Sequence, residues 1–267
     1  MDGLALWQGE ADLDTGGSFE ARRVFLRGGG IYRFATGNSV GVFASLGELQ
    51  YDFSGVAPAP WGDIRDLRLS VPVRLRLDSG ASVFLVPSLR YDYEDGASQS
   101  DGETYGALAG ITWEAGPNLT IGPGFGAFTE LGADDDWDIF PILLVDWRIN
   151  DQWRLSTGDA IGATQGPGLS LRYQHTDDLS FALGARYENV RFRLDGTGPA
   201  PGGVGEDEAV PVVISMRYEP TPFASFTAYA GAEFGGSLTL ENAAGAVISR
   251  TDYDTAPVAG LAFRLRF

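Results

Sequence analysis

Residues 137–149, WDIFPILLVDWRI, alternate in character with a period of two. One set is apolar and rich in aromatics: Trp137, Ile139, Pro141, Leu143, Val145, Trp147 and Ile149. The interleaved set carries the charges of Asp138, Asp146 and Arg148. Successive side chains of a β-strand point to opposite faces of a sheet. The segment therefore predicts a strand with one apolar face and one charged face.

The same alternation recurs along the whole chain, for example over residues 67–77. Short polar turns at 36–38, 78–80, 116–118, 150–151, 176–178 and 220–222 alternate with longer acidic loops near 12–18, 54–63, 95–102, 133–136, 162–167, 196–208 and 242–250. This punctuation predicts fourteen strands, near 3–11, 18–35, 39–53, 64–78, 82–95, 103–115, 119–132, 137–149, 152–162, 167–176, 179–195, 207–220, 224–242 and 250–267. Without the first strand and one other, the number would be twelve.

Composition excludes several classes of protein. No run of 18 apolar residues exists, which excludes a transmembrane helix, and the chain has no cysteine for disulfides or thiol chemistry. All nineteen basic residues are arginine, yet the net charge is −17, so nucleic acid is not an expected partner. The first residues lack the features of a signal peptide, and we expect a leader to have been removed if the protein is exported.

The distribution of charge between the two faces indicates which one is inside. The polar face is rich in arginine and glycine, which suits a wet lumen better than the core of a soluble fold. The apolar face ends in aromatics close to turns and loops, where interfacial girdles form. Residues 1–267 therefore predict a single all-β domain, a transmembrane antiparallel up-and-down β-barrel with its short turns and both termini in the periplasm.

The last predicted strand carries a recognisable ending, in which Leu261, Phe263, Leu265 and Phe267 alternate with Ala262, Arg264 and Arg266. It resembles the C-terminal signature of outer-membrane proteins of Gram-negative bacteria, which implies these four residues as the signal for barrel insertion. Asp136–Leu155 and GPGLSLRY at 166–173 resemble uncharacterised outer-membrane, porin-like barrel domains. The resemblance implies the bacterial outer membrane as location. It also implies membrane lipid, lipopolysaccharide and the barrel-assembly machinery as partners, but it brings no substrate or catalytic residue.

Arginines of the polar face are the candidate functional residues. Parity places fourteen of them in the lumen, and ten of these form the predicted selectivity lining: Arg27, Arg68, Arg74, Arg76, Arg90, Arg148, Arg172, Arg186, Arg217 and Arg264. The other four are Arg23, Arg33, Arg154 and Arg266. In one interpretation they pair with carboxylates on neighbouring strands and fill the barrel. In the other they line a conduit for anionic solutes, because guanidinium groups stay charged and bind oxyanions through two parallel hydrogen bonds. Sequence alone leaves both open.

Two functions remain in view, a passive porin-like channel for small, anionic solutes and a non-transporting barrel that acts as scaffold, receptor or subunit of an envelope complex. No predicted loop exceeds about a dozen residues, so we expect wall side chains rather than an inward loop to narrow any pore. Catalysis is not expected, because the only histidine, His175, lies beside a turn. No cofactor or metal is expected either. The acidic clusters at 134–136 and 206–208, and Asp252 with Asp254, lack the calcium-loop spacing and are interpreted as solvated surface charge.

Overall fold

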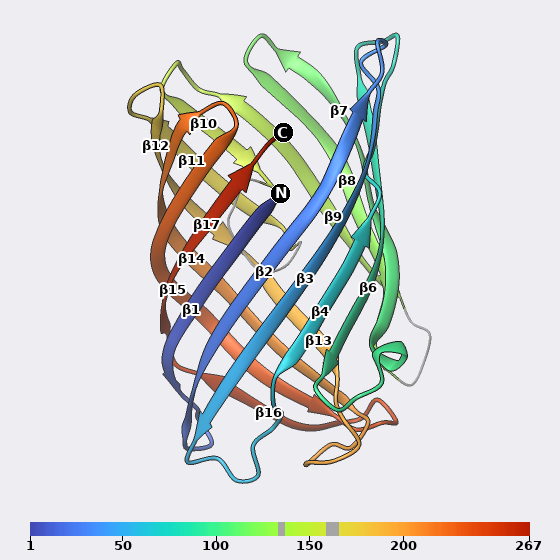
Figure 1. Ribbon diagram of the computed structural model, residues 1–267, viewed down its shortest axis with the longest axis vertical. Coiled ribbons are helices and arrows are strands. Elements are labelled where there is room, and N and C mark those ends of the chain that lie inside the picture. The colour runs from blue at the N-terminus through green and yellow to red at the C-terminus, as the bar shows by residue number, and fades with distance from the viewer. Residues whose placement is uncertain (133–136, 159–165) are drawn as a thin grey trace.

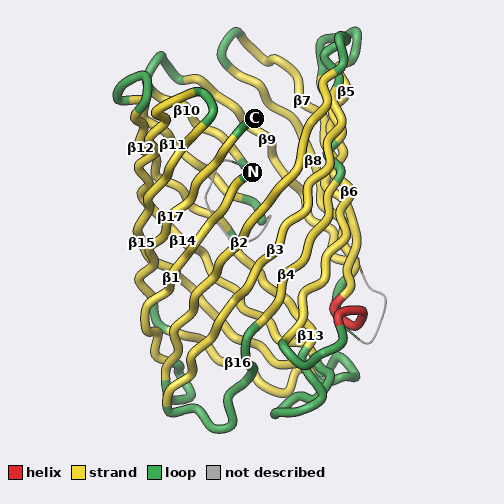
Figure 2. The backbone as a smooth tube through the Cα atoms, in the orientation of Figure 1, coloured by secondary structure: helices red, strands yellow, loops and turns green. Residues whose placement is uncertain are grey.

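The structure is a computed structural model that describes residues 1–132, 137–158 and 166–267. These residues form one sheet that closes on itself as a barrel (Figures 1 and 2). The strands are β1 (Asp2–Asp12), β2 (Ser18–Arg33), β3 (Ser39–Ser54), β4 (Ile64–Ser70), β5 (Val73–Arg76), β6 (Ser82–Glu94), β7 (Glu103–Gly116), β8 (Leu119–Thr129), β9 (Trp137–Arg148), β10 (Trp153–Thr157), β11 (Gly168–Gln174), β12 (Leu179–Arg186), β13 (Glu188–Arg193), β14 (Val204–Thr221), β15 (Ala224–Glu241), β16 (Val247–Tyr253) and β17 (Ala256–Leu265). A short 3-10 helix, η1 (Gln99–Gly102), lies in one loop.

Three pairs of these segments each form one strand of the wall. Segments β4 and β5 both pair with β3 and β6, β12 and β13 both pair with β14, and β16 and β17 both pair with β15. The described wall therefore has fourteen strands, which confirms the predicted number and the first strand near residue 3. Antiparallel pairing of β1 with β17 closes the sheet. On its β10 side, β9 is paired only from Asp146 to Arg148 within the described residues.

Short turns and longer loops lie at opposite ends of the barrel. Both termini lie toward the end that carries the short turns, which we call the turn end, and the opposite end is the loop end (Figure 1). Gly37 and Gly80 have φ angles of 84° and 85°, a left-handed conformation that side-chain-bearing residues rarely adopt. This requirement explains the turn sequences Thr36-Gly37-Asn38 and Asp78-Ser79-Gly80.

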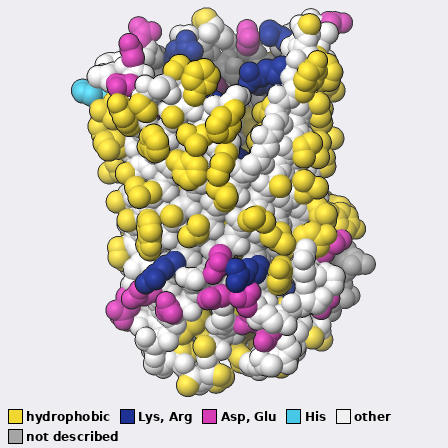
Figure 3. Space-filling view, in the orientation of Figure 1, with side chains coloured by type: hydrophobic (Ala, Val, Ile, Leu, Met, Phe, Trp, Pro, Cys, Tyr) yellow, Lys and Arg dark blue, Asp and Glu magenta, His cyan; other side chains and the backbone are white. Residues whose placement is uncertain are grey.

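The outer surface carries a broad apolar band (Figure 3). Leu143 is 61% exposed on this surface, whereas Leu144 faces inward against Gly110 and Gly124. Trp137, Trp147 and Trp153 are also exposed outside. No helix in the described part of the chain is long and apolar enough to cross a membrane. An exposed apolar surface of this extent is typical of contact with lipid.

Charged side chains border the band toward the loop end (Figure 3). On the outer face of β4, Arg65 is 2.8 Å from Glu48 and 2.8 Å from Asp95. The hydrogen bond from Arg65 holds the pKa of Asp95, which lies beyond the end of β6, below its usual range. These exposed pairs mark the level at which the outer surface becomes polar.

An apolar core fills one side of the interior at the loop end. It brings the loop-end parts of β1 to β4 against those of β13 to β16, with Phe19, Leu49, Ile64 and Phe192 almost fully buried. The ring of Phe192 lies 5.1 Å from that of Trp61, which belongs to the loop before β4. Wall side chains alone were expected to narrow the lumen. Instead Trp61 of a loop joins the core, and β13, which stays paired with β14, bends across to β6, where Arg193 bridges to Tyr93.

Opposite faces of β9 give a direct test of this architecture. Arginine at Leu143 should destabilise the barrel by about 2–4 kcal/mol, because a charge on the lipid face near mid-height loses its hydration. Arginine at Leu144 should cost much less, because that side chain faces the lumen. Equilibrium unfolding of both variants in lipid vesicles measures the difference, and equal penalties would show that the facing assignment is wrong.

Candidate functional site

Strand register places the ten predicted arginines on the inner face of the wall. Arg264, Asp2 and Arg27 are directly opposed across the closing seam, and the row continues through Ser45 to Arg68 and Arg90. Directly opposed residues share a face of the sheet. A second row joins Arg148, Arg154 and Arg172. The remaining predicted residues have the same inward parity on their strands: Arg74 and Arg76 on β5, Arg186 on β12 and Arg217 on β14.

The arginines of the loop half are paired and buried, beginning with Arg23. Its guanidinium group lies 2.8 Å from Asp207 and 3.0 Å from Glu233, and it donates a hydrogen bond to Gln8. The hydroxyl groups of Tyr51 and Tyr253 both donate to Asp207 as well. Two carboxylates and three neutral donors or acceptors thus surround one cation beneath the apolar core.

A second paired cluster crosses β4 and β6. Arg68 lies 3.3 Å from Asp66, and Arg90 lies 3.5 Å from Asp66 and 2.9 Å from Asp92. Further along the wall, Arg186 faces Glu188 at 3.8 Å. Burial of a charge is costly unless an opposite charge compensates it, which accounts for the pairing here. In this half of the barrel the arginines fill the lumen together with carboxylates.

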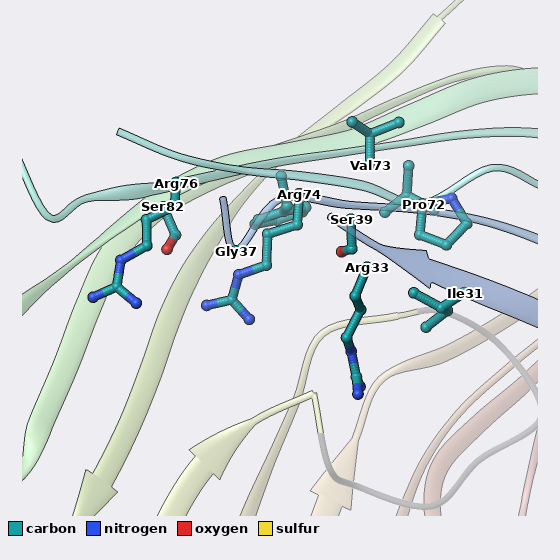
Figure 4. Close-up of a pocket in the computed structure, with 11 residues that line it drawn as sticks. Ile31, Arg33, Gly37, Ser39, Pro72, Val73, Arg74, Arg76 and Ser82 are labelled. Atoms are coloured by element: carbon teal, nitrogen blue, oxygen red, sulfur yellow. The ribbon is translucent and has the colours of Figure 1, made fainter. Parts of the chain in front are cut away.

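Arginines of the turn half have a different environment. Arg33, Arg74 and Arg76 line a cavity of about 610 Å³ between the β2–β3 turn and β5–β6, and their guanidinium groups point into it (Figure 4). All three are exposed, and none forms an ion pair within the described residues. A cavity of about 290 Å³ shares Arg74, Ser82 and Phe84 with the first. We call this joint space the vestibule.

The other turn-half arginines have individual surroundings. Arg27 forms a two-pronged interaction with Asp2 and lies over the ring of Phe43 at 5.4 Å. Arg148 and Arg264 are exposed inside the barrel, and Arg217 donates to Thr227 at 3.4 Å. Within the described residues, no group of three metal-ligating side chains comes together.

Two features of the interior were not predicted. Residues 206–208 were expected in a solvated loop, but they lie in β14, where Asp207 binds Arg23 and Glu206 binds Arg191. The prediction was wrong because β14 begins at Val204, three residues before the predicted strand near 207–220, so all three acidic residues lie on a paired strand. The other predicted acidic cluster, 134–136, lies outside the described residues. Parity also places Arg33 in the lumen, but it was not among the ten arginines of the predicted selectivity lining.

Glu94 links three segments at the loop end. Its Oε1 accepts a hydrogen bond from the backbone N–H of Gly62 at 2.6 Å, and its Oε2 accepts one from Asp195 at 2.9 Å. These two residues belong to the loop before β4 and to the loop after β13. Arg193 donates to the backbone carbonyl of Asp101 nearby. We call Glu94 with these two amides the Glu94 clamp, and it ties the inward-bent β13 to the wall.

The residues of the predicted insertion signal lie at the end of β17. Leu261 is exposed on the outer face, the ring of Phe263 covers Gly3 of β1, and Phe267 is fully exposed. Leu265 shares this outward parity. Their recognition by an insertion machinery stays a prediction.

Comparisons with known proteins support the fold. No protein-family model and no curated protein matches the chain. Among solved structures, it is similar to an outer-membrane channel from Pseudomonas putida F1, with 14% identity, a TM-score of 0.54, and coverage of 99% of this chain and 94% of that chain. The NanC porin matches at 11% identity and a TM-score of 0.42, covering 100% of this chain and 99% of that one. At 14% identity, the likeness to the first of these structures shows the barrel fold and nothing about the solute.

The contribution of Arg23 to stability can be compared with that of Arg22, the adjacent residue on the outer face of β2. Arg23→Ala should destabilise the barrel by about 3–5 kcal/mol, because it leaves Asp207 and Glu233 buried without a cation. Arg22→Ala, on the outward and exposed side of the same strand, should cost less than about 0.5 kcal/mol. Urea unfolding of the two variants in the same lipid measures both values. Similar costs would show that the buried network contributes little.

The Glu94 clamp predicts a local effect rather than global unfolding. Glu94→Gln replaces one accepting oxygen by an NH2 group, so one of the two amides loses its acceptor. Hydrogen exchange at Gly62 or Asp195 should become at least about tenfold faster, which corresponds to loss of one hydrogen bond to a charged group. Asp52→Asn, at an exposed site on β3, serves as the control. Unchanged exchange at both amides would contradict the clamp.

Proposed function

We propose that the protein is a passive channel of the bacterial outer membrane for small solutes, in which the vestibule favours anions. The observation that carries the proposal is the set of three exposed arginines, Arg33, Arg74 and Arg76, around a cavity of about 610 Å³. Cations of the loop half are neutralised by adjacent carboxylates, whereas these three are not within the described residues. Their positive charge is therefore available to interact with a permeating solute.

Electrostatics explain how three residues can influence permeation despite a net charge of −17. Fixed charges act over about one Debye length, roughly 8 Å at physiological salt, so those lining a narrow passage affect each ion that enters it. Guanidinium groups remain charged at all physiological pH values and bind carboxylates and phosphates in a planar, two-pronged geometry. Small carboxylates, phosphates or acidic sugars fit this chemistry.

The outer surface supports the proposed location. Its apolar band requires an apolar solvent, and the β1–β17 seam closes the sheet that carries the band. Membrane lipid would cover the band, and lipopolysaccharide would meet the charged border near Arg65. Assembly machinery for barrels would be the partner during insertion.

One observation favours the alternative, a non-transporting scaffold or receptor. The apolar core and the inward path of β13 occupy part of the interior at the loop end. A barrel closed there would present its loop surface to a partner and carry no solute. Conductance therefore separates the two functions.

The vestibule predicts a specific selectivity. Purified protein in a planar bilayer under a potassium chloride gradient should show a reversal potential of the sign expected when chloride is more permeant than potassium. The double variant Arg74→Gln, Arg76→Gln should move that potential toward zero, because it removes two of the three vestibule cations. Arg22→Gln, on the outer surface, should leave it unchanged. Cation selectivity of the native barrel, or no conductance at all, would favour the scaffold.

A further inference from the structure

A separate cavity of about 400 Å³ lies in the loop half, between the β8–β9 part of the wall and the inward-bent β13. Two parallel rings form its apolar side, because Phe128 and Phe140 stack at a centroid distance of 6.3 Å and an interplanar angle of 10°. Pro141 and Tyr187 extend this surface. The volume suits a small organic molecule, and the cavity shares no lining residue with the vestibule.

Carboxylates dominate the polar lining of this cavity, which we call the outer cavity. Both of its arginines are already paired, Arg90 with Asp92 at 2.9 Å and Arg191 with Glu206 and Glu241, each at 3.2 Å. Two further lining carboxylates, Glu130 and Asp138, form no ion pair or hydrogen bond within the described residues. The uncompensated charge of the outer cavity is therefore negative, opposite to that of the vestibule.

The carboxylates lie next to the aromatic surface. Asp138 of β9 is directly opposite Phe128 of β8, and Glu130 follows Phe128 by two residues and so has the same parity. A ligand that stacks on the two rings would consequently have carboxylate oxygens at its edge. Arg191 lines the same cavity and interacts with Glu130 at longer range, but it is shared with Glu206 and Glu241.

A buried group with unused bonding capacity also lines the outer cavity. Asp92 is only 2% exposed, and its Oδ1 has no hydrogen-bond partner within the described residues. Asp66 lies directly opposite on β4, and the two carboxyl groups interact with each other and with Arg68 and Arg90. This buried cluster therefore adds no free cation to the cavity wall.

We propose that the outer cavity is a binding site for a small organic ammonium compound with an apolar or aromatic body. Its ammonium group donates charge-assisted hydrogen bonds to Asp138 and Glu130, within reach of the Asp92 side of the cavity. Its body lies on Phe128 and Phe140, whose ring faces also attract the cation. A bare divalent ion would instead need six or more oxygen ligands and would gain nothing from the aromatic surface.

Phenethylammonium is a suitable probe, and phenylacetate is the matched anion with the same ring. Each is titrated calorimetrically into the purified full-length barrel in a non-ionic detergent. Phenethylammonium should bind with saturable heat, and phenylacetate should not compete with it. The double variant Glu130→Gln, Asp138→Asn should weaken binding of the cation at least about tenfold, because two charged acceptors are lost. Phe140→Leu should weaken it as well through the lost ring contact.

The matched control is Asp151→Asn with Asp178→Asn, two carboxylates removed from turns at the other end of the barrel, which should leave binding unchanged. Near-ultraviolet circular dichroism of each variant shows whether the barrel is folded. Equal affinity for both probes, or native affinity in the Glu130→Gln, Asp138→Asn variant, would overturn the proposal. The readout is independent of conduction, so a barrel that passes no ions can still bind the probe, and an anion channel can fail to bind it.

Discussion

The seam between β1 and β17 closes the sheet, with seven directly opposed pairs from Asp2↔Arg264 to Gln8↔Val258. In an apolar solvent every backbone N–H and C=O of the wall needs an internal partner, and only a closed sheet supplies one for every strand. Closure in turn forces each strand to have one side chain outside and the next inside. Exposure of Leu143 and the inward position of Leu144 both follow from this single constraint.

Inside the wall, the bend of β13 divides the interior into two regions. Gly205 of β14 makes this packing feasible, because a Cβ there would lie 2.4 Å from the ring of Phe192. The buried rings exclude water from the adjacent interior, and the charges of that region are accordingly paired, as for Arg23 with Asp207 and Glu233. Arg74 and Arg76, which lie beyond this region, are exposed to the vestibule and keep their charge available.

Period-two alternation was sufficient to predict the fourteen strands, their facing and the inward position of the arginines. It could not predict which arginines are neutralised, because pairing depends on residues far apart in sequence, such as Arg23 on β2 and Asp207 on β14. The contact of Trp61 with Phe192 joins a loop to a distant strand and has no periodic signal. Likewise, the outer cavity forms where β13 approaches the β8–β9 wall. Sequence alone therefore could not distinguish its carboxylates from carboxylates on the outer surface.

Two opposite charge environments result within one barrel, negative in the outer cavity and positive in the vestibule. Both depend on the division of the interior into a sealed region and a water-accessible one. The natural absence of cysteine allows a direct measurement of that division, the reaction of single cysteines with a water-soluble, sulfonate-bearing thiosulfonate. Ser82→Cys in the vestibule should react readily, while Ala209→Cys in the buried core should stay unmodified until the barrel is unfolded. Equal rates at the two positions, or protection of Ser82→Cys, would contradict the divided interior.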